Sequence, residues 1–152
     1  MLFRSVAILY SRESGYANKY ASEISELGNA RKSVNAILHD LGLQYRYVSG
    51  PQVAAGVLDK TATRLLILPY CQALRQDEAD AIRAFVKAGG TVLADTRPAV
   101  WDELCRPLDK GRLDDVFGIQ RTHAGKYVVY GDLTLTRAVP GLDAKEIGRA
   151  HV

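Results

Sequence analysis

This chain of 152 residues has no long hydrophobic run and only two cysteines. No apolar run approaches the roughly 18 residues of a membrane-spanning helix, so we expect a soluble protein with no membrane partner. The first apolar stretch, Val6–Tyr10, has the length of a strand and no small-residue cleavage site behind it, so we expect no signal peptide. Two cysteines are too few for a disulfide framework and lack the spacing of a metal knuckle. Their number favours a reducing compartment, and we expect a cytoplasmic protein.

The chain also has no strong excess of charge of one sign. The 20 basic and 17 acidic residues are scattered along the chain and leave a formal net charge of +3. No block of about five or six like charges, basic helix or set of RNA-binding aromatics occurs, so no nucleic acid partner is indicated. Neither GxGxxG after the first apolar run nor GxxxxGK[ST] is present, so nucleotide binding is unsupported and we assign no cofactor.

Four short segments have the composition of β-strands. Val6–Tyr10, Leu65–Pro69 and Thr91–Ala94 are apolar without alternation, which is typical of parallel strands covered on both faces by helices. They are predicted to be central strands. Gln44–Val48 is more polar and alternates loosely, as a strand nearer the sheet edge does.

Helical patterns separate these segments. Between Tyr20 and Leu41, apolar residues recur at spacings of three and four, which predicts one long amphipathic helix that ends at Gly42. Gly28 lies in its middle, where a glycine permits a bend or a restart. The positions that form the predicted stripe are Tyr20, Ile24, Leu27, Arg31, Val34, Ile37, Leu38 and Leu41.

A second helix is predicted to open at Asp77 and Glu78, whose negative charge suits the N-terminal end of a helix dipole, and to stop at Gly89 and Gly90. Its buried face would be Ala79, Ile82, Phe85 and Val86. A short helical segment is expected around residues 53–58. The alternation of strands and helices predicts an α/β fold, a flavodoxin-like three-layer sandwich with a mostly parallel central sheet.

Beyond Asp95 the pattern weakens. Leu113–Phe117 resembles a short helix closed by Gly118, and residues 100–105 a loop or one helical turn. Tyr127–Tyr130 and Leu133–Leu135 flank Gly131-Asp132, which predicts a hairpin at the sheet edge near the C-terminus. No linker, repeat or low-complexity tract divides the chain, so residues 1–152 are read as one domain.

Open α/β sheets bind ligands at the carboxyl ends of their strands. Cys71 stands at such an end, where a helix N-terminus can activate a thiolate, but no His-Asp or His-Glu pair lies near it among the three histidines. We favour a buried thiol there and assign no catalytic residue. The candidate binding residues at the strand ends are Ser11, Arg12, Tyr70, Cys71, Gln72, Asp95 and Arg97.

The acidic residues near the strand ends do not define a metal site or a catalytic site. Asp95 alone cannot define a metal site, and no metal is assigned. A glycosidase needs two carboxylates that face each other across a sugar. Glu13, Asp95 and Glu103 are too loosely placed in the sequence to be assigned that role.

Several stretches carry a family resemblance: VAILYS at residues 6–11, LILP at 66–69 with DEA at 77–79, FVKAGGTVLAD at 85–95 and LDDVFGI at 113–119. They resemble the trimerisation domain of β-galactosidases of glycoside hydrolase family 42, over roughly residues 5 to 120. The resemblance implies a fold similar to class I glutamine amidotransferases, without their catalysis, beside a (β/α)₈ barrel that carries two catalytic glutamates. Such a barrel takes about 250 residues, more than this chain has, so the resemblance implies a domain of a larger protein or a relative derived from one.

The amidotransferase comparison also extends to the nucleophile. In that superfamily the nucleophilic cysteine follows the strand that corresponds to Thr91–Ala94, where this sequence has Asp95-Thr96-Arg97-Pro98. Cys71 lies one strand too early, and no His-x-Glu pair follows. The resemblance therefore carries no amidotransferase activity over to this chain.

Three hypotheses follow. The first is a non-catalytic module of a β-galactosidase-like protein that associates with copies of itself, for example as a trimer, or with a barrel domain, using aromatic anchors such as Tyr16 and Trp101. The second is a binding domain for a sugar or sugar acid at the strand ends. The third is a Cys-dependent hydrolase or amidotransferase with Cys71 as nucleophile.

Overall fold

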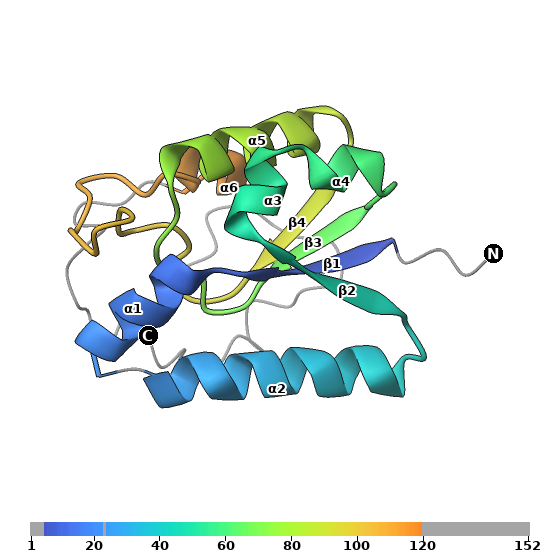
Figure 1. Cartoon of the computed structure of the whole chain (residues 1–152), viewed down its shortest axis with the longest axis horizontal. Coiled ribbons are helices and arrows are strands. Elements are labelled where there is room, and N and C mark those ends of the chain that lie inside the picture. Colours follow the sequence, from blue (N-terminus) through green and yellow to red (C-terminus); the bar gives the residue numbers. More distant parts are fainter. Residues whose placement is uncertain (1–4, 23, 120–152) are drawn as a thin grey trace, which may run out of the picture.

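A four-stranded sheet with helices on both faces forms the centre of the molecule (Figure 1). The computed structural model describes residues 5–22 and 24–119. The predicted hairpin at Tyr127–Tyr130 and Leu133–Leu135 lies outside these residues. The described elements, in chain order, are β1 (Val6–Tyr10), α1 (Arg12–Tyr20), α2 (Ile24–Asp40), β2 (Tyr45–Ser49), α3 (Gly50–Ala54), α4 (Val57–Lys60), β3 (Leu65–Leu68), α5 (Gln76–Lys87), β4 (Thr91–Ala94) and α6 (Asp114–Phe117).

The sheet has the strand order β2-β1-β3-β4, and every neighbouring pair is parallel. Val6 of β1 is in register with Tyr45 of β2 on one side and with Leu65 of β3 on the other. Figure 1 shows α2 on one face of the sheet and α3, α4 and α5 on the opposite face. The α/β fold with a parallel central sheet, consistent with a flavodoxin-like three-layer sandwich, is confirmed.

Alternate side chains of each strand build two separate cores. Val6 and Ile8 of β1 belong to a small cluster with Leu38 of α2. Leu9 points to the other face and joins a larger cluster that contains Ile82 of α5. Each large side chain fully buried in this way contributes about 1.5–3 kcal/mol relative to an exposed one. Burial on both faces explains why β1 reads as a continuous apolar run.

The connection from β1 to β2 differs from the prediction of one long helix. It consists of α1 and α2, and the chain turns after α1 ends at Tyr20, where Ser22 has a φ of +61°. Ser11 caps α1, because its Oγ accepts the Ser14 N–H at 2.9 Å. Gly28 lies inside α2 and marks no break. The sequence of α1, RESGYANKY, is too polar to show an apolar stripe, so periodicity alone missed it.

The apolar stripe predicted for α2 is wider than the face that the sheet covers. Leu27 and Leu38 are buried, and Val34 packs against the core. Ile37 and Leu41 are instead exposed. Even α2, with its 17 residues, does not combine the length and apolarity that crossing a membrane requires, and neither does any other described helix.

Helix α5 matches its prediction closely. Ala79, Ile82 and Phe85 are buried, and Val86 packs against the same core. The helix ends two residues before Gly89, whose φ of +93° suits a residue without a Cβ.

Strand β4 is placed differently from the prediction that it is central. Within residues 5–22 and 24–119 it is the outermost strand on its side of the sheet. Val92 packs toward the α5 face, whereas Thr91 and Leu93 are exposed. A short apolar run alone does not show how many of its faces are covered. Further on, α6 ends at Gly118, which confirms the short helix predicted there.

Candidate functional site

The topology singles out one place at the carboxyl end of the sheet. The chain leaves β1 toward β2 through α1 and α2, and it leaves the adjacent β3 toward β4 through α5. The two connections run in opposite directions and cover opposite faces, as Figure 1 shows. Such a switch point opens a crevice between the two strand ends, which is where open α/β sheets bind ligands.

Hydrogen bonds join the two strand ends beneath this crevice. Ser11 Oγ donates to the Ala73 carbonyl at 3.0 Å, and Ser14 Oγ donates to the same oxygen at 2.8 Å. Ser14 Oγ also accepts the Ala73 N–H at 3.0 Å. Both serines are buried. Ser11, a predicted binding residue, therefore caps α1 and fastens it to the segment after β3, while the neighbouring Arg12 is exposed at the first position of α1.

Cys71 is part of the same buried network. Its sulfur lies 3.6 Å from Ser14 Oγ, and its exposed fraction is 2%. Burial raises the pKa of the thiol to about 12, which opposes formation of a thiolate nucleophile at neutral pH. His39, the one histidine in the described part of the chain, is exposed on α2 beside Asp40. Gln72, next to Cys71, is fully buried as well.

Tyr70 and Asp95 come together at the ends of β3 and β4. Asp95 Oδ1 accepts the Tyr70 N–H at 2.7 Å, and Asn18 Nδ2 donates to the Tyr70 carbonyl at 3.3 Å. Removal from water raises the pKa of Asp95, although backbone N–H groups, Tyr70's first, act to lower it. Tyr70 and Arg97 have φ values of +50° and +45°, in the left-handed region that costs a non-glycine residue energy. The hydrogen bond that the Tyr70 N–H donates to Asp95 helps to hold Tyr70 in that conformation.

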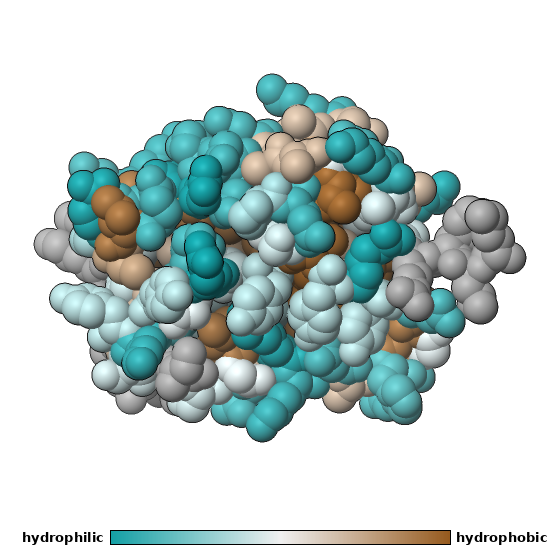
Figure 2. All heavy atoms as spheres, viewed as in Figure 1, coloured by the Kyte–Doolittle hydropathy of each residue, from teal (hydrophilic) through white to brown (hydrophobic). Residues whose placement is uncertain are grey.

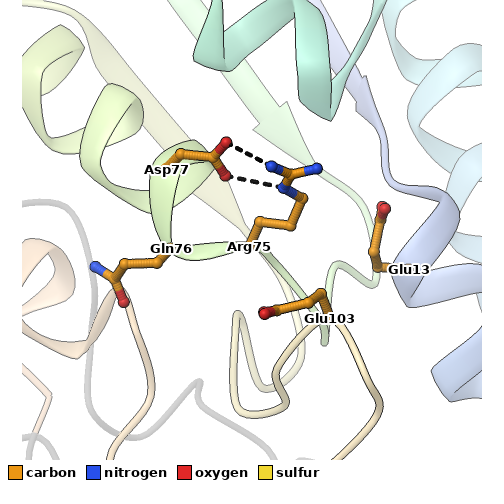
Figure 3. A pocket seen from close by; sticks show the side chains of 5 residues that line it. All are labelled: Glu13, Arg75, Gln76, Asp77 and Glu103. Carbon is orange, nitrogen blue, oxygen red and sulfur yellow. Dashed lines mark hydrogen bonds and ion pairs between the residues drawn. The ribbon is translucent and has the colours of Figure 1, made fainter.

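The crevice itself contains a polar hollow that sequence reasoning missed as a unit (Figure 3). The polar hollow has a volume of about 480 Å³ and is lined by Glu13, Arg75, Gln76, Asp77 and Glu103. Glu13 comes from the first turn of α1, residues 75–77 form the start of α5, and Glu103 comes from the loop after β4. Glu13 and Glu103 were recognisable as acidic residues near strand ends, but Asp95 does not line the hollow with them.

Ion pairs fix most of the charged groups of the polar hollow. Arg75 donates from Nε and an Nη to the two carboxylate oxygens of Asp77, at 3.0 and 2.8 Å. Arg112 holds Glu103 at 2.7 Å. Hydrogen bonds from these guanidinium groups lower the pKa values of Asp77 and Glu103. Glu13 makes no hydrogen bond or ion pair to the residues that the structure describes, so its carboxylate remains available.

A second surface feature lies on the outer side of α1. Tyr20 is 81% exposed and meets Trp101 edge to face, with ring centroids 6.3 Å apart. Tyr16, one turn earlier on α1, is 60% exposed. We call Tyr16, Tyr20 and Trp101 the aromatic patch. The face of the molecule in Figure 2 is mostly hydrophilic. Hydrophobic groups reach this surface in several places, one of them at the left, over the loop that follows β4 in Figure 1.

Metal ligands do not gather in the described part of the chain, where no group of three or more His, Cys, Asp or Glu side chains could hold an ion. The carboxylates of the polar hollow thus do not form a metal centre by geometry.

Comparison with known proteins finds similarity among solved structures. No protein-family model matches the sequence, and no curated protein matches it either. Among solved structures, a β-galactosidase from Bifidobacterium adolescentis is similar, with a TM-score of 0.65 and 19% sequence identity. The match covers 80% of this chain and 57% of that chain, so this chain spans a little over half of the chain it resembles. At this identity the likeness shows a shared fold.

Proposed function

We propose that this chain is a non-catalytic association module of a β-galactosidase-like carbohydrate-active protein. The shared fold with a chain of a bifidobacterial β-galactosidase supports the link to such proteins. The sequence resemblance to the trimerisation domain of glycoside hydrolase family 42 points the same way. The partner would be further copies of the chain, with three as the expected number, or a catalytic barrel domain.

The observation that carries the proposal is the exposure of the aromatic patch. Tyr20 and Trp101 support each other edge to face, yet most of the Tyr20 surface remains open to solvent. Tyrosine and tryptophan are the residue types that concentrate binding energy in protein interfaces, because they bury a large area at a small cost in conformational entropy. An isolated exposed apolar residue needs no explanation, but a supported aromatic pair beside Tyr16 fits an anchor.

The interior of the strand ends favours the same reading over a Cys-dependent enzyme. Cys71 is buried, its pKa is raised to about 12, and the hydroxyl of Ser14 beside it already donates to a backbone carbonyl. Attack on a substrate needs a thiolate that solvent and substrate can reach. Both cysteines are free, which suits the cytoplasmic location that we propose.

Sedimentation equilibrium of the purified chain tests the proposal. We expect an assembly of about three copies that dissociates on dilution, and we expect Tyr20→Lys to shift the equilibrium toward monomer by placing a charge in the interface. Ile37→Lys is the matched control, because Ile37 is also an exposed apolar residue on a helix but lies on α2, away from the aromatic patch.

Two outcomes would contradict self-association through the patch. One is a wild-type chain that stays monomeric at high concentration. The other is equal dissociation by Tyr20→Lys and Ile37→Lys. If the wild type is monomeric, binding to a separately produced β-galactosidase-type barrel decides whether the module associates at all.

A further inference from the structure

The polar hollow has the size and the position of a ligand site. Its volume of about 480 Å³ lies within the range of small-molecule pockets, roughly 300–1,000 Å³. Its lining comes from α1, which follows β1, from the start of α5, which follows β3, and from the loop after β4. These segments leave the sheet at its switch point, where the topology leaves room between two diverging connections. Three separate segments of the chain contribute side chains to it, as Figure 3 shows.

The lining favours a ligand rich in hydroxyl groups. All five lining side chains end in charged or amide groups that can hydrogen-bond a polar ligand, and their carbon stems supply the rest of the surface. The Glu13 carboxylate can accept from two hydroxyls, since it makes no hydrogen bond to any described residue. Two hydrogen bonds to Asp77 fix the orientation of the Arg75 guanidinium group, and its remaining N–H groups are available as donors. Adjacent hydroxyls of a sugar ring are matched by planar donor and acceptor groups of this kind.

The charge of the polar hollow also limits which class of ligand it can bind. Three carboxylates line the hollow, and two of them are paired, Asp77 with Arg75 and Glu103 with Arg112. Glu13 is the lining carboxylate that no described guanidinium group neutralises. Glu78 adds a buried carboxyl nearby, and its pKa is raised first by burial and then by the charges of Glu13 and Asp77. The hollow is therefore locally negative on a chain whose formal net charge is +3. A phosphate or carboxylate on the ligand would be repelled, whereas an ammonium group would be attracted.

We propose that the polar hollow binds a saccharide without acidic groups and that it prefers an amine-bearing sugar to the neutral one. Arg75 and Glu13 bind the ring hydroxyls, and Glu13 also receives the ammonium group. This site is distinct in its residues from the strand-end candidates Ser11, Cys71 and Gln72, which are buried. The proposal is independent of the association role, because the aromatic patch shares no residue with the hollow.

Three sugars of one ring stereochemistry test the proposal. Glucosamine, glucose and glucuronate differ in charge, and at about pH 6.5 the first is cationic and the last anionic. We titrate each into the isotope-labelled chain at fixed ionic strength and follow backbone amide shifts by NMR. The expected order of affinity is glucosamine, then glucose, then glucuronate, with the shifts centred on Glu13, residues 75–77 and Glu103.

Glu13→Gln is the decisive variant. The substitution keeps the size of the side chain and removes its charge. It should lower the affinity for glucosamine by about tenfold, as the loss of a charged hydrogen bond does, and should change the affinity for glucose less. Glu26→Gln makes the same charge change on the exposed face of α2 and should bind like the wild type. The wild-type order of affinity stands as a test even if a variant fails to fold.

The proposal is overturned if none of the three sugars moves these amides, if glucuronate binds best, or if Glu13→Gln and Glu26→Gln weaken glucosamine equally. Sedimentation of Glu13→Gln separates the two proposals. If Glu13→Gln loses sugar binding while its assembly is unchanged, the substitution acts on the polar hollow alone. If no assembly forms while the sugar still binds, only the association role is contradicted.

Discussion

The Glu78 carboxylate occupies the space in which a side chain at Gly50 would stand. Gly50 opens α3 and Glu78 lies in the first turn of α5, so this approach packs the two helices closely on one face of the sheet. Glu78 is fully buried, and its Oε2 accepts the Arg75 N–H at 3.0 Å. The same carboxyl group thus caps α5 and sets how near α3 can come.

We expect Gly50→Ala to destabilise the protein by about 1–3 kcal/mol, because the added methyl group overlaps the carboxylate and forces it to move. Displacing Glu78 also breaks its bond to the Arg75 N–H. Gly28→Ala is the matched control, since nothing lies near that position inside α2, and it should stabilise by about 0.5–1 kcal/mol. Urea denaturation of both variants measures the two effects, and an unchanged midpoint for Gly50→Ala would show that the close approach costs nothing to relieve.

A pH dependence follows from the same residue. Burial raises the pKa of Glu78 above its ordinary value, helped by the charges of Glu13 and Asp77. The folded state therefore holds the proton more tightly than the unfolded state. The contribution of Glu78 to stability is complete below the unfolded pKa of about 4.3 and is lost as the pH rises through the higher folded pKa.

Glu78→Gln should remove that loss. The amide oxygen can still accept the Arg75 N–H, while no charge is buried. We expect the wild type to lose stability relative to Glu78→Gln as the pH rises from about 4 to 7, in denaturation curves recorded at each pH. Parallel stability profiles for the two proteins would show that this carboxyl group titrates equally in the folded and unfolded states.

Most of the fold could be predicted because its signals are local. Three apolar runs and one more polar, alternating segment marked the four described strands to within one residue, and Gly42 and Gly89 marked the ends of α2 and α5. The division between α1 and α2 was missed, because no glycine or proline marks residues 21–23 and the polar sequence of α1 hides its one buried edge. The outer position of β4 depends on which elements cover it, which its own residues do not encode.

The candidate site was harder to predict, because its interactions are remote in the chain. The bonds from Ser11 and Ser14 to Ala73 span 62 and 59 residues, so both serines read as available hydroxyls until the fold is known. The polar hollow joins Glu13, residues 75–77 and Glu103. Only the rule for strand ends at a switch point could have suggested the first two of these segments.

Cys71 should be inert in the native protein. Its burial and a pKa of about 12 leave almost no thiolate near pH 8. In the Cys105→Ser variant, which carries this thiol alone, we expect iodoacetamide to modify nothing until the chain is unfolded. Rapid native modification, measured by intact mass, would reopen the Cys-dependent hydrolase or amidotransferase hypothesis.

The hydroxyl of Ser14 should matter for stability through the backbone that it satisfies. Ser14→Ala leaves the buried N–H of Ala73 without an acceptor and removes one of two donors to the Ala73 carbonyl, which should cost about 1–3 kcal/mol. Ser33→Ala, on the exposed side of α2, is the matched control and should change stability by no more than about 0.5 kcal/mol. Hydrogen exchange locates the effect, because the Ala73 amide should lose protection in Ser14→Ala while amides in α2 keep theirs. Equal denaturation midpoints for the two variants would mean that water replaces the lost hydroxyl, and that the segment after β3 is held by packing rather than by these bonds.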